Sequence, residues 1–218
     1  MEIAVFSDVI CPWCFVGKRR LERALDELGW RDRVAIEWLP FELNPDMPAG
    51  GMERAAYRAR KFGAERSAML DEQMRAVGAE EGIRFAFDPM TRTPNTRHAH
   101  MLIAGAARQG DGPAAVERLV EALFQAYFEQ GRDIGDEATL AEIAASAGLD
   151  REQASTALRD ETLERMVVQG ERRAAELGIS GVPYFIVDRS WAVSGAQPAH
   201  LWVDALRKMT ATAERAAG

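Results

Sequence analysis

The first forty residues switch between strand-like and helix-like spacing of their apolar positions. Apolar residues alternate over residues 2–7, which predicts a short strand. They then recur at helical spacing from Leu21 to Leu28, which predicts a helix that Gly29 ends. Alternation returns over residues 34–38. The N-terminal order is therefore strand, helix, strand.

The middle of the chain, from about residue 52 to 177, carries almost only helical periodicity. It follows a stretch rich in Asn, Asp, Pro and Gly, residues 42–51, which predicts a loop. Asp150 with Gln153 forms a D-x-x-Q helix-start signal. No repeat of 20–50 residues is visible, so the helices are predicted to form a bundle rather than a solenoid. The apolar stripes include Leu70, Ala99, Leu102, Val116, Leu123, Leu140, Ile143, Leu163 and Val167.

The C-terminal segment returns to strand patterns. "PYFIVD" and "WAVSG" predict two strands joined at Asp188–Arg189, which is hairpin spacing, and residues 196–209 predict a closing helix. A βαβ half and a ββα half make one small sheet with helices on both faces. The sequence thus predicts an α/β domain built from residues 1–44 and 178–218, with residues 45–177 as an inserted helical domain.

Composition narrows the function classes. The chain has 218 residues and a net charge of −7, so no basic surface indicates nucleic acid as a partner. No apolar run approaches the roughly 20 residues that a membrane helix needs. The N-terminus lacks the pattern of a secretory signal, so we expect a cytoplasmic protein.

Both cysteines of the chain lie in "CPWC", residues 11–14, between the first strand and the first helix. Two residues three apart at a helix start have Cα atoms about 5–6 Å apart, within disulfide range. The helix start favours the thiolate of Cys11, and Pro12 suits the first helical position. We therefore assign Cys11 as the attacking thiol, partly exposed, and Cys14 as the buried resolving thiol. Two unreactive core thiols are the alternative.

A metal site is the other interpretation of a C-x-x-C, and the chain offers little to complete one. A structural zinc site needs four ligands, but His98, His100 and His200 are far from the cysteines in sequence. The H-x-H spacing at 98–100 would also place two rings about 200° apart on a helix. We expect neither a metal nor a cofactor other than a redox-active Cys11–Cys14 disulfide.

Several motifs carry a family resemblance. "CPWC" after a first strand, with "GVPYF" much later, resembles the thioredoxin superfamily, and the long helical insertion resembles its DsbA branch. "DVICPWCFVGK", "PFELNPDMP", "NTRHAH" and "SGAQP" together are similar to the cytosolic FrnE-like oxidoreductases, over roughly residues 3 to 206. The resemblance implies a thioredoxin-like fold with a large all-helical insertion, and a thiol–disulfide oxidoreductase acting on protein or small-thiol disulfides.

The same resemblance assigns site residues. It implies a cis-proline at Pro183 that faces the dithiol and, with Val182, aligns the substrate; Pro12 and Trp13 complete the predicted substrate-binding residues. Two positions depart from the pattern. Val5 stands where thioredoxins and DsbA commonly have a buried carboxylate, and strand alternation suggests that Asp8 points elsewhere. Trp13 replaces the histidine of DsbA, so we expect a less oxidising pair.

Two other functions stay open. Kappa-class glutathione transferases and hydroxychromene-carboxylate isomerases resemble this fold but typically carry serine at the position of Cys11. Asn95 matches an asparagine that those enzymes use near glutathione, although an asparagine after a proline is also typical of a helix cap. The third function is a non-catalytic, redox-responsive binding module whose helical insertion holds a partner.

Overall fold

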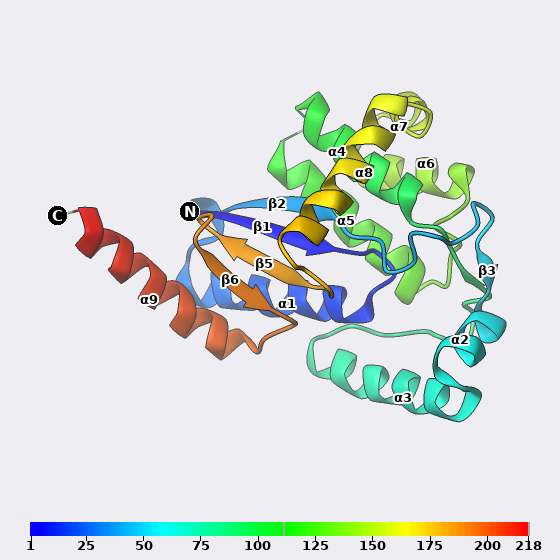
Figure 1. Cartoon of the computed structure of the whole chain (residues 1–218), viewed down its shortest axis with the longest axis horizontal. Coiled ribbons are helices and arrows are strands. Elements are labelled where there is room, and N and C mark those ends of the chain that lie inside the picture. The colour runs from blue at the N-terminus through cyan, green and yellow to red at the C-terminus, as the bar shows by residue number, and fades with distance from the viewer. Residues whose placement is uncertain (111, 218) are drawn as a thin grey trace.

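The computed structural model describes residues 1–110 and 112–217. Asp111 and Gly218, which fall within the two predicted domain ranges, lie outside the described residues. A four-stranded sheet occupies the centre, with helices on both of its faces and a helical layer beyond one end (Figure 1). Across the described residues, no helix combines the length and apolar character needed to cross a membrane.

The sheet joins strands from the two ends of the chain. β1 (Glu2–Ser7) pairs in parallel with β2 (Ala35–Pro40) and antiparallel with β5 (Tyr184–Val187), and β6 (Trp191–Ser194) completes the order β2-β1-β5-β6. The predicted strands are therefore present. Backbone φ angles of 46° and 57° at Asp188 and Arg189 fit the tight turn between β5 and β6.

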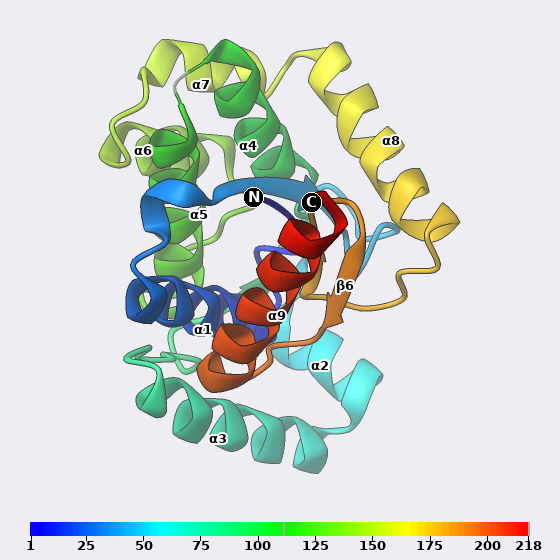
Figure 2. The ribbon, with the colours of Figure 1, turned by 90° about the vertical axis from the view of Figure 1, so that its left-hand side faces the viewer.

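Two helices from opposite ends of the chain cover one face of the sheet. α1 (Pro12–Leu28) and α9 (Ala199–Ala217) pack side by side, and Figure 2 shows α9 crossing in front of the sheet beside α1. Their shared apolar core includes Leu21, Phe185 and Trp202, each at most 2% exposed. Gly29 ends α1 in a left-handed conformation, as its position after the last apolar residue predicted.

The inserted stretch supplies most of the helices. They are α2 (Arg54–Phe62), α3 (Ala64–Glu80), α4 (Arg97–Gln109), α5 (Pro113–Phe128), α6 (Glu137–Ser146), α7 (Arg151–Ala157) and α8 (Glu161–Glu176), and a short 3₁₀ helix (Arg31–Arg33) precedes β2. Asp150 caps α7 by accepting a hydrogen bond from Gln153 N, as the D-x-x-Q signal predicted. Phe15 of α1 stacks on Phe124 of α5 with ring centroids 5.0 Å apart, so the helical layer shares its core with the first turns of α1. The division into two domains stays a prediction.

The helical reading of residues 52–177 misses one element. β3 (Met52–Glu53) and β4 (Arg92–Thr93) form a small antiparallel sheet, and the chain between Gly82 and β4 is not helical. Strands of two residues are too short to show a period of two, and a glycine with φ of 73° turns the chain out of α3. The last apolar stripe, which includes Leu163 and Val167, lies in α8 and not in the helix that Asp150 starts, because Asp160 caps a new helix.

Candidate active site

The two cysteines lie at the start of α1, directly after the turn that follows β1. Cys11 is the N-cap residue, with φ −91° and ψ 111°, and Pro12 occupies the first helical position. The Cys11 N–H donates to Asp8 O at 3.0 Å, and the Cys14 N–H donates to Cys11 O at 3.0 Å. No side chain caps this helix start, so the Cys11 thiol lies where an N-cap oxygen would be expected.

Both thiols are free and both are buried. Cys14 is 1% exposed, as expected, but Cys11 is only 5% exposed, so the expectation of a partly exposed Cys11 is wrong. The reason is tertiary: Cys11 lies in the wall of a cleft whose other walls come from α2, α3 and the chain between β3 and β4. Trp13, 37% exposed, is the residue of the motif that faces solvent.

The segment that precedes β5 reaches Cys11 from the far end of the chain. The Val182–Pro183 peptide bond is cis, and the Cys11 thiol donates to the Val182 carbonyl oxygen at 3.5 Å. Pro183 packs on α1 at Gly17, where a Cβ atom would lie 2.9 Å from Pro183 Cγ. Gly17 therefore leaves the space that Pro183 needs beside the thiols, a role that no sequence pattern indicated.

Cys14 lies deeper and in surroundings that favour its neutral form. Burial raises its pKa well above the usual range, and the neighbouring Cys11 raises it further. The Ser7 hydroxyl and the Asp8 backbone N–H act in the opposite direction, but they do not offset the burial. At neutral pH, Cys14 is thus held as a thiol.

The cleft at Cys11 has a volume of about 340 Å³ and two kinds of lining. The apolar lining includes Ile10, Trp13, Leu43, Phe62, Leu70, Met74, Phe87, Met90 and Phe128. The charged lining consists of Arg54, Arg58, Lys61 and Asp71, which is three cations and one carboxylate. Asp71 lies 2.8 Å from each arginine, while Lys61 Nζ donates to Tyr57 Oη at 2.7 Å.

The predicted residues do not all meet at this cleft. Cys11, Pro12 and Trp13 line it, and Val182 contacts Cys11. Asn95 is absent from the described lining, in which Thr93 is its nearest neighbour in sequence. Its side chain donates to Met47 O at 2.7 Å and accepts from Arg97 N at 2.9 Å, and the N-cap residue of α4 is the next residue, Thr96.

Asp8, three residues before Cys11, carries a fully buried carboxylate. Val5 is indeed a core residue, but Asp8 is 0% exposed, because its carboxylate turns inward after the end of β1. It accepts hydrogen bonds from Leu43 N at 2.7 Å and Ile10 N at 3.3 Å, and His100 Nε2 lies 3.7 Å from its Oδ1. Strand alternation could not reveal this, since Asp8 lies beyond the strand.

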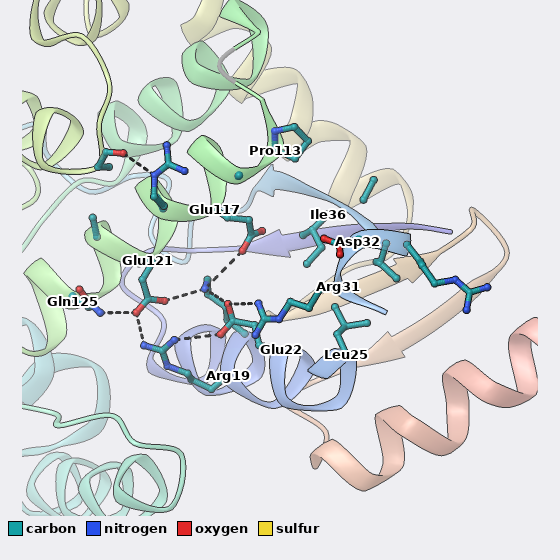
Figure 3. A pocket seen from close by; sticks show the side chains of 18 of the residues that line it. Arg19, Glu22, Leu25, Arg31, Asp32, Ile36, Pro113, Glu117, Glu121 and Gln125 are labelled. Carbon is teal, nitrogen blue, oxygen red and sulfur yellow. Dashed lines mark hydrogen bonds and ion pairs between the residues drawn. The ribbon is translucent and has the colours of Figure 1, made fainter. Parts of the chain in front are cut away.

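A larger hollow, about 1180 Å³, lies on the other side of α1, between this helix, β2 and α5 (Figure 3). Neither cysteine lines it. Its wall holds Lys18, only 4% exposed, which lies 2.5 Å from Glu22, 2.9 Å from Glu121 and 3.7 Å from Glu117. Ion pairs across the hollow join α1 to α5, so we regard it as part of the scaffold rather than as the reaction site.

The fold and the dithiol define a class, and the chain belongs to the DSBA-like thioredoxin domain family, which matches residues 2–207. The crystal structure of a probable DsbA oxidoreductase from Streptomyces coelicolor is 33% identical, with a TM-score of 0.86 over 95% of this chain and 89% of that one. The expected thioredoxin-like fold with a helical insertion, and the DsbA resemblance, are confirmed.

Two further proteins extend the comparison. The uncharacterized protein YwbO of Bacillus subtilis is 29% identical over 188 residues, 86% of each chain. The cytosolic disulfide reductase DsbM from Pseudomonas aeruginosa, solved with GSH, is 20% identical, with a TM-score of 0.66 over 96% of this chain and 99% of that chain. At that identity the likeness to DsbM concerns the fold. The family supports a redox or isomerase enzyme.

Proposed function

We propose that the protein is a thiol–disulfide oxidoreductase in which Cys11 attacks and Cys14 resolves. The observation that carries the proposal is the pair of free thiols one helical turn apart, with Cys11 lining the cleft and Cys14 behind it. The N-terminus of α1 favours an anion at Cys11, whereas burial opposes one at Cys14. This asymmetry suits two different roles.

The reaction proceeds in two exchanges. The Cys11 thiolate attacks one sulfur of a substrate disulfide, which forms a mixed disulfide and releases the other sulfur as a thiolate. Cys14 then loses its proton and attacks Cys11 Sγ, which releases the second substrate thiolate. Two electrons pass from the dithiol to the substrate, and the reverse sequence oxidises a substrate dithiol.

The walls of the cleft indicate the substrates. A volume of about 340 Å³ lies at the lower end of the range for small-molecule sites. The excess of cations on the Arg54, Arg58 and Lys61 side favours acidic groups, and the apolar floor favours aliphatic or aromatic neighbours of the cystine. Small-thiol disulfides and exposed cystines of acidic peptide segments are the proposed substrates, with Val182 and Pro183 aligning the chain beside Cys11.

We place this activity in the cytoplasm. Structural disulfides are rare in that compartment, and a chain whose only two cysteines form one catalytic pair has no structural disulfide to lose there. DsbM is described as cytosolic, which agrees with the proposal.

Turnover in an insulin disulfide-reduction assay tests the function. The Cys11→Ser variant should lose all turnover, because the attacking thiol is gone. The Cys14→Ser variant should accumulate a mixed disulfide on Cys11, visible as a mass increase that dithiothreitol removes. Equal residual turnover in both variants would rule out the assigned roles. His200→Ala, on the exposed side of α9, is the matched control and should retain wild-type activity.

The cationic cleft beside Cys11 also favours a second function, a glutathione-dependent transferase or isomerase. In that reaction Cys14 is not needed, because glutathione supplies the only reacting thiol. Glutathione titration by calorimetry and a transferase assay with a chromogenic chlorodinitrobenzene substrate distinguish the two. Full transferase activity in Cys14→Ser, together with no insulin reduction by the wild type, would establish the second function in place of the first.

A further inference from the structure

Two buried polar atoms behind Cys14 face one small cavity. Ser7 is 5% exposed and His100 is 4% exposed, and within the described residues Ser7 Oγ and His100 Nε2 have no hydrogen-bond partner. Both residues line a cavity of about 20 Å³ between the ends of β1 and β2 and the helices α4 and α5. An unpaired buried polar group lowers the stability of the folded state. A cavity above about 10–15 Å³ with polar walls is large enough for one water molecule.

Ser7 connects this cavity to Cys14. Ser7 follows Ile3 and Val5 on the face of β1 that is covered by α1, and this places its hydroxyl beneath the first turn of that helix. Burial raises the pKa of Cys14, and the approach of the Ser7 hydroxyl to its sulfur lowers it, although the contact lacks the geometry of a full hydrogen bond. A hydroxyl both accepts and donates a proton, so Ser7 is able to relay one.

His100 connects the opposite wall of the cavity to Asp8. Its Nε2 atom lies 3.7 Å from Asp8 Oδ1, and the backbone N–H groups of Leu43 and Ile10 hold that carboxylate in place. The chain thus carries a buried carboxylate three residues before Cys11, although the position of Val5 is apolar.

Other charged groups approach this pair from neighbouring elements. From α8, Glu171 contributes a carboxylate whose pKa is raised by burial, and it accepts a hydrogen bond from Glu42 N at 2.5 Å. Glu42 itself is paired with Arg97 of α4 at 2.6 Å. On the α5 side, Glu117 accepts from the indole of Trp38, which lines the cavity. The carboxylates that interact with His100 are those of Asp8, 3.7 Å away, and Glu171.

We propose that Asp8 and His100 exchange the proton of Cys14, through the Ser7 hydroxyl and one water in the cavity. The inference rests on the proposed function. In the mixed disulfide, the Cys14 proton passes to Ser7 Oγ, Ser7 passes its own proton to the water, and the water passes one to His100 Nε2. The Cys14 thiolate attacks Cys11 Sγ, the bond from Cys11 to the substrate sulfur breaks, and the substrate thiolate leaves and is protonated by solvent.

The reverse exchange restores the starting state. When a reductant thiolate opens the Cys11–Cys14 disulfide at Cys11, Cys14 leaves as a thiolate and recovers its proton from the imidazolium by the same route. His100 touches neither sulfur of the reacting pair. It is a positioning residue that accepts and returns the Cys14 proton through Ser7. The electrons are exchanged between sulfur atoms only.

The reaction with 5,5′-dithiobis(2-nitrobenzoate) separates the two exchanges. Attack by Cys11 releases one thionitrobenzoate, and resolution by Cys14 releases a second, so stopped-flow absorbance shows two phases. In His100→Gln, whose amide nitrogen replaces Nε2 without exchanging a proton at neutral pH, the first phase should keep its wild-type rate. The second phase should slow on the order of 100-fold at pH 7, which is the range of a lost general base.

A pH series supplies a readout that a structural role would not change. The rate of the second phase should depend less on pH in the wild type than in His100→Gln, because in that variant only hydroxide removes the Cys14 proton. Asp8→Asn should slow the second phase less than His100→Gln, since the imidazole remains. His200→Gln, on the exposed surface of α9, is the matched control and should behave as wild type.

Ser7→Ala keeps the inference falsifiable if His100→Gln does not fold. It removes one small hydroxyl and should also slow only the second phase. A second phase that keeps the wild-type rate and pH profile in Ser7→Ala and in any folded His100→Gln would overturn the relay, as would equal slowing of both phases. A wild-type protein that shows no first phase would overturn the proposed function, and the relay with it.

Discussion

Two consecutive turns of α1 bury chemically opposite groups. Cys14, 1% exposed, lies beside Phe15, which stacks on Phe124 with centroids 5.0 Å apart. Lys18, one turn further and 4% exposed, lies among the carboxylates of Glu22, Glu117 and Glu121. The same helix therefore presents a neutral acid to an apolar core and a cation to an acidic cluster.

The comparison shows that neighbours, not burial alone, decide whether a buried group is charged. Burial raises the pKa of Cys14, and no cation is near enough to reverse the effect. Burial lowers the pKa of Lys18, but Glu22, Glu121 and Glu117 raise it by more, so the ammonium stays charged. Glu117 marks the limit of this compensation, because burial raises its pKa despite Lys18 and the Trp38 indole.

The difference separates two tasks along one helix. The turn that carries Lys18 joins α1 to α5 through ion pairs with Glu117 and Glu121. The apolar turn keeps Cys14 as a neutral thiol, because burial raises its pKa. A permanent thiolate at Cys14 would attack a mixed disulfide on Cys11 as soon as it formed.

The pH dependence of Cys14 alkylation gives the largest expected effect. In a Cys11→Ala variant, the rate of reaction with iodoacetamide should rise roughly tenfold per pH unit through neutrality, because only the thiolate reacts. It should not level off near the ordinary thiol pKa of about 8.5, since burial, the largest cause of the raised pKa, remains after Cys11 is removed. A plateau near 8.5 would show that Cys14 is not desolvated and would remove the contrast with Lys18.

Lys18→Met should lower the free energy of unfolding by about 3–5 kcal/mol, because it leaves three carboxylates around an uncharged side chain. Urea denaturation at neutral pH measures the change. The pKa of Lys18 is raised in the folded state, so its contribution is fully present at neutral pH and is lost as the pH rises through that raised value. Arg165→Ala, which removes an exposed pair with Glu161, is the control and should cost at most about 0.5 kcal/mol. If both variants lost the same free energy of unfolding, burial would not be what makes the Lys18 cluster important.

Gly17→Ala should have the smallest effect on stability and a measurable one on turnover. Its Cβ would lie 2.9 Å from Pro183 Cγ and 3.4 Å from Phe185 Cζ, and overpacking of this kind costs about 1–3 kcal/mol. The helix preference for alanine returns up to about 1 kcal/mol. Insulin turnover should fall, because Pro183 is displaced from the dithiol. Gly181→Ala, where a Cβ meets nothing within 4 Å, is the matched control; if it lowers turnover as much, the contact at Gly17 is not the cause.

Much of the fold was predictable because its signals are local. The strand at residues 2–7, the helix that begins at Pro12 and the hairpin at Asp188–Arg189 follow from periodicity and turn residues in their own segments. The small β3–β4 sheet was missed because its strands are two residues long. Its stability depends on pairing between residues about forty positions apart, and a local hydrophobic pattern does not indicate such pairing.

By itself, the sequence determined the position of the dithiol at a helix start and the order of the strands along the chain, because these depend on residues near one another. Its motifs also identified the DsbA-like family. Only the tertiary structure decided the electrostatics of the site. Cys11 is covered by walls of the helical insertion, Asp8 meets His100 from α4, and Lys18 meets Glu117 and Glu121 from α5. The physical reason is that desolvation and charge interactions depend on distance in space, and these partners are separated by about 90 to 100 positions in the sequence.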